Sequence, residues 1–411
     1  MIKVVIVTSG QPSLNPRLVK EADALSDQGF MVTVIYQYWN DWGTVADLTL
    51  LKNKKWTAIR VGGDPANKKI QYLISRIKHR TSNLLAKYLG LTYGIAEFAI
   101  KRNVYGLLDK AKSIKADLYI AHNLGALPVA VLASKKHYAK CGFDAEDFHR
   151  QEQTDNKNSL AFRLAQFIED KYLPGVDYLT VASPLIGKEY EKFYPNLNPV
   201  IINNVFPASY IQVKKLSDEG EKLKLFWFSQ TIGKGRGIED AIKALASIKR
   251  KHISLTLLGN INEANQAYFL GLANDYRLEQ EQLNFVSPVS PDKVFELANK
   301  YDIGLALESG FCLNNDIALS NKIFTYLTSG LAVIASETSA QKEFIEKYPT
   351  IGVSYPIGNV EALAIIINNY DTNRELLQQA KFTSYLLAKE CMNWELESKK
   401  FISLIEKTLK D

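Results

Sequence analysis

The chain has 411 residues, 46% of them hydrophobic and 23% charged, proportions near the globular average that exclude general disorder and correspond to two or three domains. Three cysteines, an odd number without close spacing, exclude a disulfide framework and a thiolate zinc site and favour a reducing compartment. The net charge of +6 is unevenly distributed, because residues 51–140 hold 18 Lys and Arg against 4 Asp and Glu, which predicts attraction to an anionic partner.

The first half of the chain alternates strand and helix signals, the pattern of a parallel sheet. A helix is predicted over residues 15–28, because Asn15 is a suitable N-cap, Pro16 takes the first helical position and Gly29 follows the last turn. The strands predicted in this half are Val4–Thr8, Met31–Tyr36, Asp117–Ala121, Tyr178–Ala182 and Val200–Ile202.

A polar stretch, residues 208–222, separates this half from a second alternating series. We therefore expect two α/β domains. The closing segment, residues 380–409, has a charged helical pattern that we expect to reach back to the first domain. The strands predicted in the second half are Leu223–Phe228, Ser254–Leu258, Leu283–Val286, Ile303–Leu307, Leu331–Ala335 and Gly352–Ser354.

A turn rich in glycine and cations follows the strand Leu223–Phe228. Its sequence, residues 229–237, contains three glycines together with Lys234 and Arg236 and leads into a helix. Glycine allows close backbone approach and the cations neutralise charge, so the turn suits an anion. The alternative is a flexible surface turn with two solvated cations.

A second candidate anion site begins at Ser320, where Ser320 or Asn321 is expected to cap a helix that ends before Gly330. Lys322 then lies in the first turn, where a cation opposes the helix dipole by about 0.3–1 kcal/mol unless an anion lies between it and the amides. We therefore expect removal of the Lys322 charge to leave folding intact or to improve it slightly. The alternative is an exposed lysine that bends into water.

Several ligand-binding motifs are absent from the sequence. The first strand runs into residues 9–12, Ser-Gly-Gln-Pro, instead of the Gly-x-Gly-x-x-Gly of a dinucleotide site, and no Walker-type loop is present. No two aspartates stand two positions apart, so an Asp-x-Asp metal clamp is also missing. We therefore expect neither a cofactor nor a catalytic metal.

Short blocks spread along nearly the whole chain carry a family resemblance. Residues 15–17, Asn-Pro-Arg, and residues 121–123, Ala-His-Asn, are similar to an Asp-Pro-Arg helix start and an Ala-His-Asp block. In this order and spacing the blocks resemble glycosyltransferase family 4, whose members have the GT-B fold. The later blocks that carry the resemblance are residues 29–32, 223–237, 257–260, 284–288, 321–333 and 394–395.

The resemblance implies an α/β protein of the GT-B class: two Rossmann-like parallel-sheet domains facing across a cleft, with a C-terminal helix that crosses back to the first domain. We place an acceptor-binding domain at 1–207, a linker at 208–222, a nucleotide-sugar-binding domain at 223–385 and the helix at 386–411. Lys234, Arg236 and Lys322 are expected to neutralise the donor diphosphate without a metal. The expected donor-binding residues are Gly10, Ser229, Lys234, Arg236, Gly237, Asn260, Glu308, Asn321 and Lys322.

The sequence departs from the family pattern in its acidic residues. Ile317 and Thr325 occupy the positions of two glutamates that hold the donor sugar and ribose in many relatives. Glu308, after a strand end, or Asp316 is expected to take over part of these contacts.

A second departure concerns the reacting centre. Glu146 stands where some relatives have a histidine that contacts the reacting atoms, so Glu146 and His122 are the predicted catalytic residues. A carboxylate in this position can orient the acceptor hydroxyl or take its proton, and His149 is a rival for the role. The alternatives are a solvated acidic loop or helix cap for Glu146 and a structural role for His122.

The basic segment, residues 68–87, combines cations with Ile70, Leu73, Ile74 and Ile77 on one helical face. This pattern is typical of an interfacial membrane helix, and a core-packed helix with a basic outer face is the alternative. No nucleic-acid-binding module accompanies the charge, which argues against a nucleic acid partner.

The resemblance, together with the absence of an Asp-x-Asp pair, implies a retaining, metal-independent glycosyltransferase of the hexosyltransferase type. The donor would be a UDP- or GDP-linked sugar, and the acceptor a hydroxyl of a saccharide or lipid-linked saccharide in cell-surface polysaccharide synthesis. A sugar-nucleotide epimerase or hydrolase and a noncatalytic scaffold with the same fold are the alternatives. Because the sequence lacks a signal peptide and an apolar run of about 18 residues, we expect a cytoplasmic protein with peripheral contact with the inner face of the cell membrane.

Overall fold

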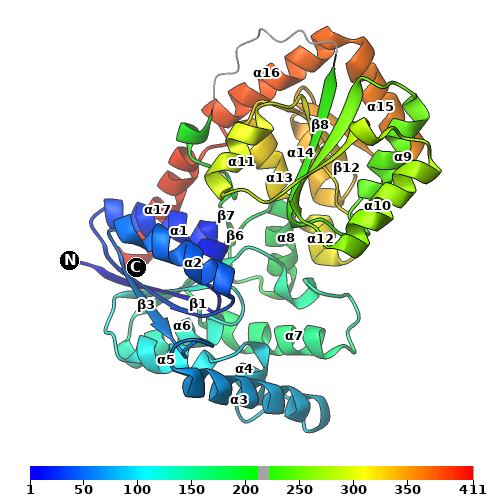
Figure 1. Ribbon diagram of the computed structural model, residues 1–411. Helices are drawn as coiled ribbons and strands as arrows, with labels where there is room; N and C mark the ends of the chain where they lie inside the picture. The colour runs from blue at the N-terminus through cyan, green and yellow to red at the C-terminus, as the bar shows by residue number, and fades with distance from the viewer. Residues whose placement is uncertain (212–221, 411) are drawn as a thin grey trace. The chain divides into compact units, whose positions relative to one another are not determined.

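The computed structural model describes residues 1–211 and 222–410 (Figure 1). The chain divides into a first unit, made of residues 1–203, 312–314 and 398–411, and a second unit, made of residues 204–311 and 315–397. The second unit thus begins before the predicted linker, residues 208–222, most of which lies outside the described residues. The last helix contributes to the first unit from Ser398.

The described part of the first unit contains one parallel sheet with the strand order β3-β2-β1-β4-β5-β6-β7. The order reverses direction between β1 and β4, and ligands of such open sheets bind outside the carboxyl ends of the strands at this point. The strands are β1 (Lys3–Thr8), β2 (Met31–Gln37), β3 (Thr57–Val61), β4 (Leu118–His122), β5 (Lys140–Ala145), β6 (Tyr178–Val181) and β7 (Val200–Ile201).

The second unit repeats the same arrangement. Within its described residues the strand order is β10-β9-β8-β11-β12-β13, so the reversal falls between β8 and β11. All paired strands of this sheet run parallel. The strands are β8 (Leu223–Thr231), β9 (Ile253–Asn260), β10 (Leu283–Val286), β11 (Ile303–Ala306), β12 (Ala332–Ser336) and β13 (Gly352–Tyr355).

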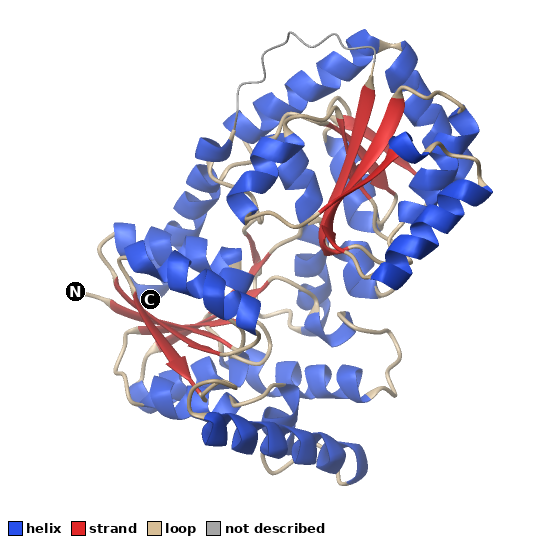
Figure 2. Cartoon of the chain, viewed as in Figure 1, coloured by secondary structure: helices blue, strands red, loops and turns tan. Residues whose placement is uncertain are grey.

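Helices cover both faces of each sheet (Figure 2). The predicted class, two Rossmann-like parallel-sheet domains, is therefore confirmed. In the first half of the chain the helices are α1 (Pro16–Asp27), α2 (Asp41–Leu50), α3 (Lys69–Tyr88), α4 (Ile95–Ile100), α5 (Val104–Lys112), α6 (Leu127–His137), α7 (Leu160–Tyr172) and α8 (Pro184–Phe193). In the second half they are α9 (Ile238–Ile248), α10 (Glu263–Asp275), α11 (Pro291–Ala298), α12 (Leu313–Ile317), α13 (Asn321–Thr328), α14 (Ser339–Lys347), α15 (Val360–Thr372), α16 (Arg374–Glu390) and α17 (Trp394–Lys410).

Helix α1 forms for the local reasons that its sequence gives. The side chain of Asn15 accepts a hydrogen bond from the backbone N–H of Leu18 at 3.0 Å, and Pro16 is the first helical residue. Gly29 has φ +83°, the left-handed conformation that ends a helix. The predicted helix is confirmed, and it carries Arg17 and Glu21 toward the buried face.

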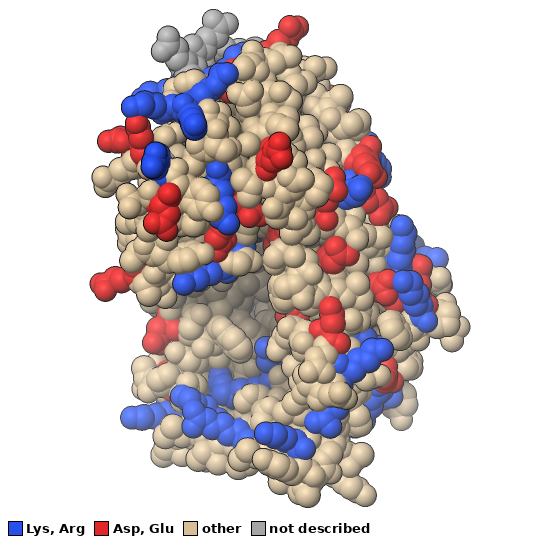
Figure 3. All heavy atoms as spheres, turned by 90° about the vertical axis from the view of Figure 1, so that its right-hand side faces the viewer, with Lys and Arg blue, Asp and Glu red and all other residues tan. Residues whose placement is uncertain are grey.

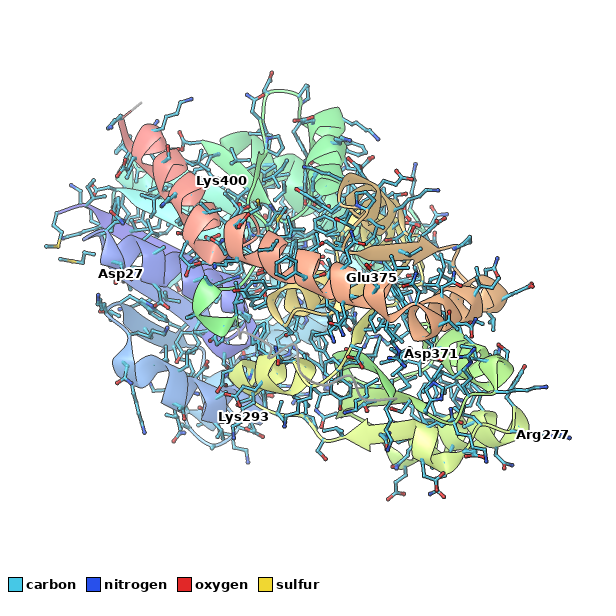
Figure 4. The ribbon with its side chains drawn as sticks, turned by 90° about the horizontal axis from the view of Figure 1, so that it is seen from above. Asp27, Arg277, Lys293, Asp371, Glu375 and Lys400 are labelled. Carbon is cyan, nitrogen blue, oxygen red and sulfur yellow. The ribbon has the colours of Figure 1, made fainter. Side chains whose placement is uncertain are left out.

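In the second unit an acidic residue ties a helix end to the sheet. Asp371, labelled in Figure 4, lies at the C-terminal end of α15 and accepts hydrogen bonds from Arg250 at 2.5 Å and Arg374 at 2.7 Å. His252, just before β9, lies 2.9 Å from the same carboxylate. Because its carboxylate is only 1% exposed, this group of contacts fixes α15 against the start of β9.

Two strands were not among those predicted. β3 is an edge strand whose residues are at best half-buried, so its pattern lacks a strong apolar signal. β5 is fully internal but contains Gly142, which lowers strand propensity. A Cβ at Gly142 would lie 2.0 Å from the ring of Tyr178, so a contact with the neighbouring strand explains this glycine.

Candidate functional sites

The predicted glycine-rich turn lies at the strand reversal of the second unit, between β8 and α9. Arg236 donates hydrogen bonds to the hydroxyl of Ser229 at 2.7 Å and to the carbonyl of Thr231 at 2.8 Å, which hold its guanidinium against the end of β8. Gly237 has φ +77°, and a Cβ there would lie 2.8 Å from the Cβ of Leu307. A glycine is therefore required at this position both for conformation and for space.

Lys322 is a buried member of an ion pair. Its Nζ lies 2.6 Å from the carboxylate of Glu308, and the two side chains are only 10% and 15% exposed. Ser320 donates a hydrogen bond to the same carboxylate at 2.9 Å, and Asn315 does so at 3.2 Å. The interpretation of Lys322 as an exposed lysine is wrong. Glu308 follows the end of β11, and the packing of β11 against α13 brings its carboxylate to Lys322.

The electrostatic balance of Glu308 follows from these contacts. Burial raises its pKa, but the charge of Lys322 and the three hydrogen bonds hold the pKa below its ordinary value. Glu308 is therefore ionised, and removal of Lys322 would leave a buried carboxylate without its cation. The expectation that this removal leaves folding intact does not fit the observed geometry.

Trp227 connects the two predicted anion-binding motifs. This β8 residue is fully buried, and its ring centroid lies 5.4 Å from the guanidinium carbon of Arg236 and 5.8 Å from Nζ of Lys322. Both cations therefore lie beside one aromatic ring at the carboxyl ends of β8 and β11. Trp227 was not among the residues predicted from the sequence, although its place two residues before Ser229 on a predicted strand was a usable signal.

The other predicted donor residues of the second unit have different surroundings. Nζ of Lys234 lies 3.9 Å from the ring centroid of Tyr268, on α10. Asn260 is the exposed last residue of β9 and is paired in register with Thr231. Asn321 is the exposed first residue of α13, a helix with Ser320 at its N-cap.

The two positions at which the family resemblance leads us to expect glutamates are buried here. Ile317 is 5% exposed and Thr325 is 2% exposed, with the Thr325 hydroxyl donating to the carbonyl of Asn321 at 3.3 Å. Asp316 accepts hydrogen bonds from the backbone N–H and hydroxyl of Ser339 at 2.9 and 2.5 Å. Of the two proposed substitutes, Glu308 is the one that forms an ion pair with Lys322.

In the first unit, charged side chains meet at the carboxyl ends of β4 and β5. His122 and Asp144 are register partners on these strands, so their side chains point to the same face of the sheet. Arg17 donates two hydrogen bonds to Asp144, at 2.6 and 2.7 Å. His122 Nε2 lies 2.9 Å from Glu21, and its Nδ1 lies 3.2 Å from Asp144.

All four side chains of this buried charge network, Arg17, Glu21, His122 and Asp144, are fully buried. Burial lowers the pKa of His122, but the neighbouring carboxylates outweigh it and raise that pKa to about 10, so His122 is a cation near neutral pH. Burial acts to raise the pKa of Asp144, whereas Arg17 and His122 hold it well below its ordinary value. The predicted catalytic residue His122 therefore serves here as a charged bridge between α1 and β5.

Three members of this network, Glu21, His122 and Asp144, have side-chain types that bind metals, and their ligand atoms lie within 4.8 Å of one another. Arg17, however, occupies both carboxylate oxygens of Asp144. The positive guanidinium repels a metal ion and already occupies the carboxylate oxygens that would coordinate it. The residues of this cluster therefore do not fit a metal ion.

Glu146 lies just beyond this network, after the end of β5. The residue is half-buried, and its pKa is raised to about 7 by burial and by the negative charge of Asp144. No hydrogen bond or ion pair to its carboxylate occurs within residues 1–211 and 222–410. A carboxyl group with this pKa and without a hydrogen-bond or ion-pair partner among the described residues can accept a proton near neutral pH.

The rival residue, His149, is 7% exposed, and its Nδ1 lies 2.8 Å from Glu152. Burial lowers its pKa, but Glu152 and other acids raise it to about 9. His149 is therefore charged near neutral pH, which makes Glu146 the better base.

Gly10 lies in the loop after β1, at the reversal of the first sheet. A Cβ at Gly10 would meet only the hydroxyl of Thr8, at 3.7 Å, so the loop has open space beside it. Asn123, after β4, accepts from Ser9 at 2.5 Å and donates to Thr8 at 2.8 Å. These bonds join the loops after β1 and β4.

Comparisons with known proteins agree with this architecture. No protein-family model and no curated protein sequence matches the chain. Solved structures do: a glycosyltransferase from Rickettsia africae ESF-5 has a TM-score of 0.70 at 14% identity, covering 100% of this chain and 99% of that one. Alr3699/HepE from Anabaena in complex with UDP has a TM-score of 0.69 at 15% identity, covering 99% and 100%.

The same fold occurs in a Listeria monocytogenes protein assigned as a UDP-N-acetylglucosamine 2-epimerase, with a TM-score of 0.60 at 12% identity over 99% and 96% of the two chains. Together these structures define the class of the present chain as the GT-B fold. Complexes with UDP and UDP-glucose occur among the proteins that share it. At these identities the likeness establishes the fold.

Proposed function

We propose that the protein is a retaining glycosyltransferase that transfers a sugar from a nucleoside diphosphate sugar to a hydroxyl of a saccharide or lipid-linked saccharide, in cell-surface polysaccharide synthesis. The observation that carries the proposal is the placement of Arg236 and Lys322 beside Trp227 at the strand reversal of the second unit. Cations fixed at this point of an open sheet suit a diphosphate. Retention and the family 4 assignment rest on the sequence resemblance.

In this mechanism Arg236 and Lys322 stabilise the negative charge that develops on the leaving diphosphate, and no metal is required. Glu308 orients Lys322 and accepts hydrogen bonds from the donor sugar. Glu146 takes the proton of the acceptor hydroxyl, and the buried charge network holds the end of β5 that carries Glu146. Because Ile317 and Thr325 replace two glutamates that hold the donor in many family members, fewer acidic side chains contact the donor in this mechanism.

The experiment is a panel of UDP-, GDP- and CDP-sugars, each with and without saccharide acceptors, in which product and released nucleotide are measured. A transferase forms a glycosylated product only with an acceptor. An epimerase, the second candidate that the Listeria structure favours, converts a UDP-sugar without one. A scaffold releases no nucleotide with any sugar, and this result would contradict both enzymatic functions. Calorimetry with UDP and GDP identifies the base.

Contact with an anionic membrane is a further part of the proposal. In α3, Ile70 and Ile77 are 75% and 61% exposed, so its apolar face is not packed into a core. The helix contains five Lys and Arg and no acidic residue. Figure 3 shows Lys and Arg side chains gathered at the lower end of one face, at the level at which α3 lies in Figure 1. No helix among the described residues is long and apolar enough to cross a membrane.

An exposed apolar face between unopposed cations suits the headgroup region of an anionic bilayer. Sedimentation with anionic and neutral vesicles at low salt tests this contact. Equal sedimentation with both kinds would contradict it, and the loss of binding to anionic vesicles at high salt would support it.

A further inference from the structure

A pocket of about 720 Å³ lies within the first unit, between the end of β3, α3 and α5. We call it the α3–α5 pocket. Its volume is in the range of about 300–1,000 Å³ typical of small-molecule sites. None of the predicted catalytic or donor-binding residues lines it, so it is separate from the sites described above.

The charge of the pocket is positive. Arg60, Lys68, Lys78 and Lys110 line it, against Asp64 and Asp109. Asp64 accepts a hydrogen bond from Arg60 at 2.6 Å and others from the backbone after it, so its charge is already matched. Lys68, Lys78 and Lys110 form no ion pair with any acid within the described ranges, which leaves three ammonium groups against one exposed aspartate.

The wall of the pocket also offers an unused hydrogen-bond donor. Asn103 has a left-handed backbone, with φ +61°, and its amide packs where a Cβ on Gly62 or on Gly106 would lie within 2.4 Å of it. Its Nδ2 is buried and has no acceptor in the described part of the chain. An unpaired buried donor is unfavourable, and a bound oxygen acceptor that reaches this amide would satisfy it.

The rim of the pocket is apolar on one side. Ile74 lines the pocket and is 47% exposed, and Ile70 and Ile77 continue its exposed face along α3. A ligand that fits this arrangement has an anionic head with several oxygen acceptors and an apolar tail. We propose that the α3–α5 pocket binds the phosphomonoester headgroup of a membrane lipid whose tails run along α3.

This inference deepens the proposed membrane contact and rests on it. A general electrostatic contact responds only to the surface charge of the bilayer, whereas a pocket also distinguishes the headgroup. A terminal phosphate reaches into the pocket more easily than a phosphodiester that carries glycerol. The two contacts therefore differ in their response to lipids of equal charge.

The experiment compares the binding of phosphatidylcholine vesicles that carry either phosphatidic acid or phosphatidylglycerol at equal surface charge. We expect the wild type to prefer phosphatidic acid by about tenfold or more. Lys78→Gln/Lys110→Gln removes two pocket cations and should abolish this preference. Arg76→Gln/Arg80→Gln removes two cations of α3 that do not line the pocket, and should weaken binding to both vesicles while keeping the preference.

Ile74→Trp is an additional variant, because it fills the mouth of the pocket without changing the charge, and it should also abolish the preference. Equal behaviour of the two double variants, or a preference that survives in Lys78→Gln/Lys110→Gln, would overturn the inference. Glycerol 3-phosphate that binds as tightly as phosphatidic acid vesicles would overturn the lipid source. Binding of UDP should be unchanged in all variants, so a failure of the proposed donor site is detected separately.

Discussion

The two strand reversals of the molecule have the same topology but opposite electrostatic character. In the second unit Arg236 and Lys322 lie beside Trp227, and of these two cations Lys322 alone has a carboxylate partner among the described residues, Glu308. In the first unit Arg17, His122, Glu21 and Asp144 pair with one another and are not exposed to solvent. One sheet geometry therefore supports both the proposed anion site of the second unit and the fully buried charge network of the first, depending on which charges follow its strands.

Glu146 lies at the edge of the buried charge network of the first unit, where the fully buried side chains give way to partly exposed ones. It follows this network by two positions, yet it is half-buried, forms no ion pair with the described residues and has its pKa raised to about 7. The strongest tests of the comparison are therefore variants that change one environment and leave the other intact.

Glu146→Gln should have the largest effect. The change removes basicity but nearly preserves shape, so we expect turnover to fall about 100- to 10,000-fold with donor affinity unchanged. Because the carboxylate form is the base, kcat/KM of the wild type should rise with pH around a midpoint of about 7, and this rise should disappear in the variant. Wild-type turnover in Glu146→Gln would show that Glu146 is structural.

Arg17→Met tests the buried charge network. It leaves Asp144 buried without its bidentate partner, so we expect the free energy of unfolding to fall by about 3–5 kcal/mol in urea titrations. The matched control is Lys55→Met, which removes an ion pair with the same 2.6 Å distance to Asp27, an exposed residue labelled in Figure 4. The control should leave the urea midpoint unchanged. A small effect of Arg17→Met, similar to that of Lys55→Met, would contradict this picture.

Arg236→Ala and Lys322→Ala test the anion site. Each should weaken binding of UDP or GDP by about 1.5–3 kcal/mol, which is about 10- to 150-fold, and the double variant should lose less than the sum. Lys234→Ala should have a smaller effect, because Lys234 lies against Tyr268. Unchanged affinity in Arg236→Ala, Lys322→Ala and their double variant would show that the donor site is elsewhere.

The stability of Lys322→Ala gives a second readout with a smaller effect. Loss of the ammonium leaves Glu308 buried without its cation, so we expect a destabilisation of about 1–3 kcal/mol. Lys322→Gln/Glu308→Gln, which removes both charges, should be more stable than Lys322→Ala. A stabilised Lys322→Ala would show instead that the unfavourable helix-dipole position dominates.

Chelation should have no effect on transfer, because the proposed charge stabilisation comes from Arg236 and Lys322. The measurement is turnover before and after EDTA, with a glycosyltransferase of known Mn²⁺ dependence as the control. Activity that is lost with EDTA and returns with Mn²⁺ or Mg²⁺ would contradict the proposed mechanism.

Helix-capping residues and short apolar runs were sufficient to predict helix α1 and most of the strands. Helix α1 follows from Asn15, Pro16 and Gly29, and most strands follow from short apolar runs. β5 was not predicted, because Gly142 weakens its apolar pattern. The glycine is required by the ring of Tyr178, which lies on the neighbouring strand and leaves no space for a Cβ. A residue that depends on a partner far along the chain does not reveal this dependence in its own neighbourhood.

The candidate sites show the same division. Arg236 and Lys322 were identified from residue type and position, but the pairing of Lys322 with Glu308 requires β11 and α13 to pack together. His122 was identified from a motif, whereas its burial among Arg17, Glu21 and Asp144 depends on the alignment of β4, β5 and α1. Sequence reasoning therefore named most of the charged residues but not the environment that decides what each one does.

The pairing of Lys322 with Glu308 also affects the entropy of binding. A free lysine side chain loses up to about 2 kcal/mol of rotamer freedom when it is fixed in one conformation. Here the carboxylate at 2.6 Å already fixes the ammonium in the folded protein, so this loss occurs during folding. Binding of a diphosphate would then cause little further loss of side-chain entropy at Lys322. The site is therefore preorganised and does not need to become ordered around its ligand.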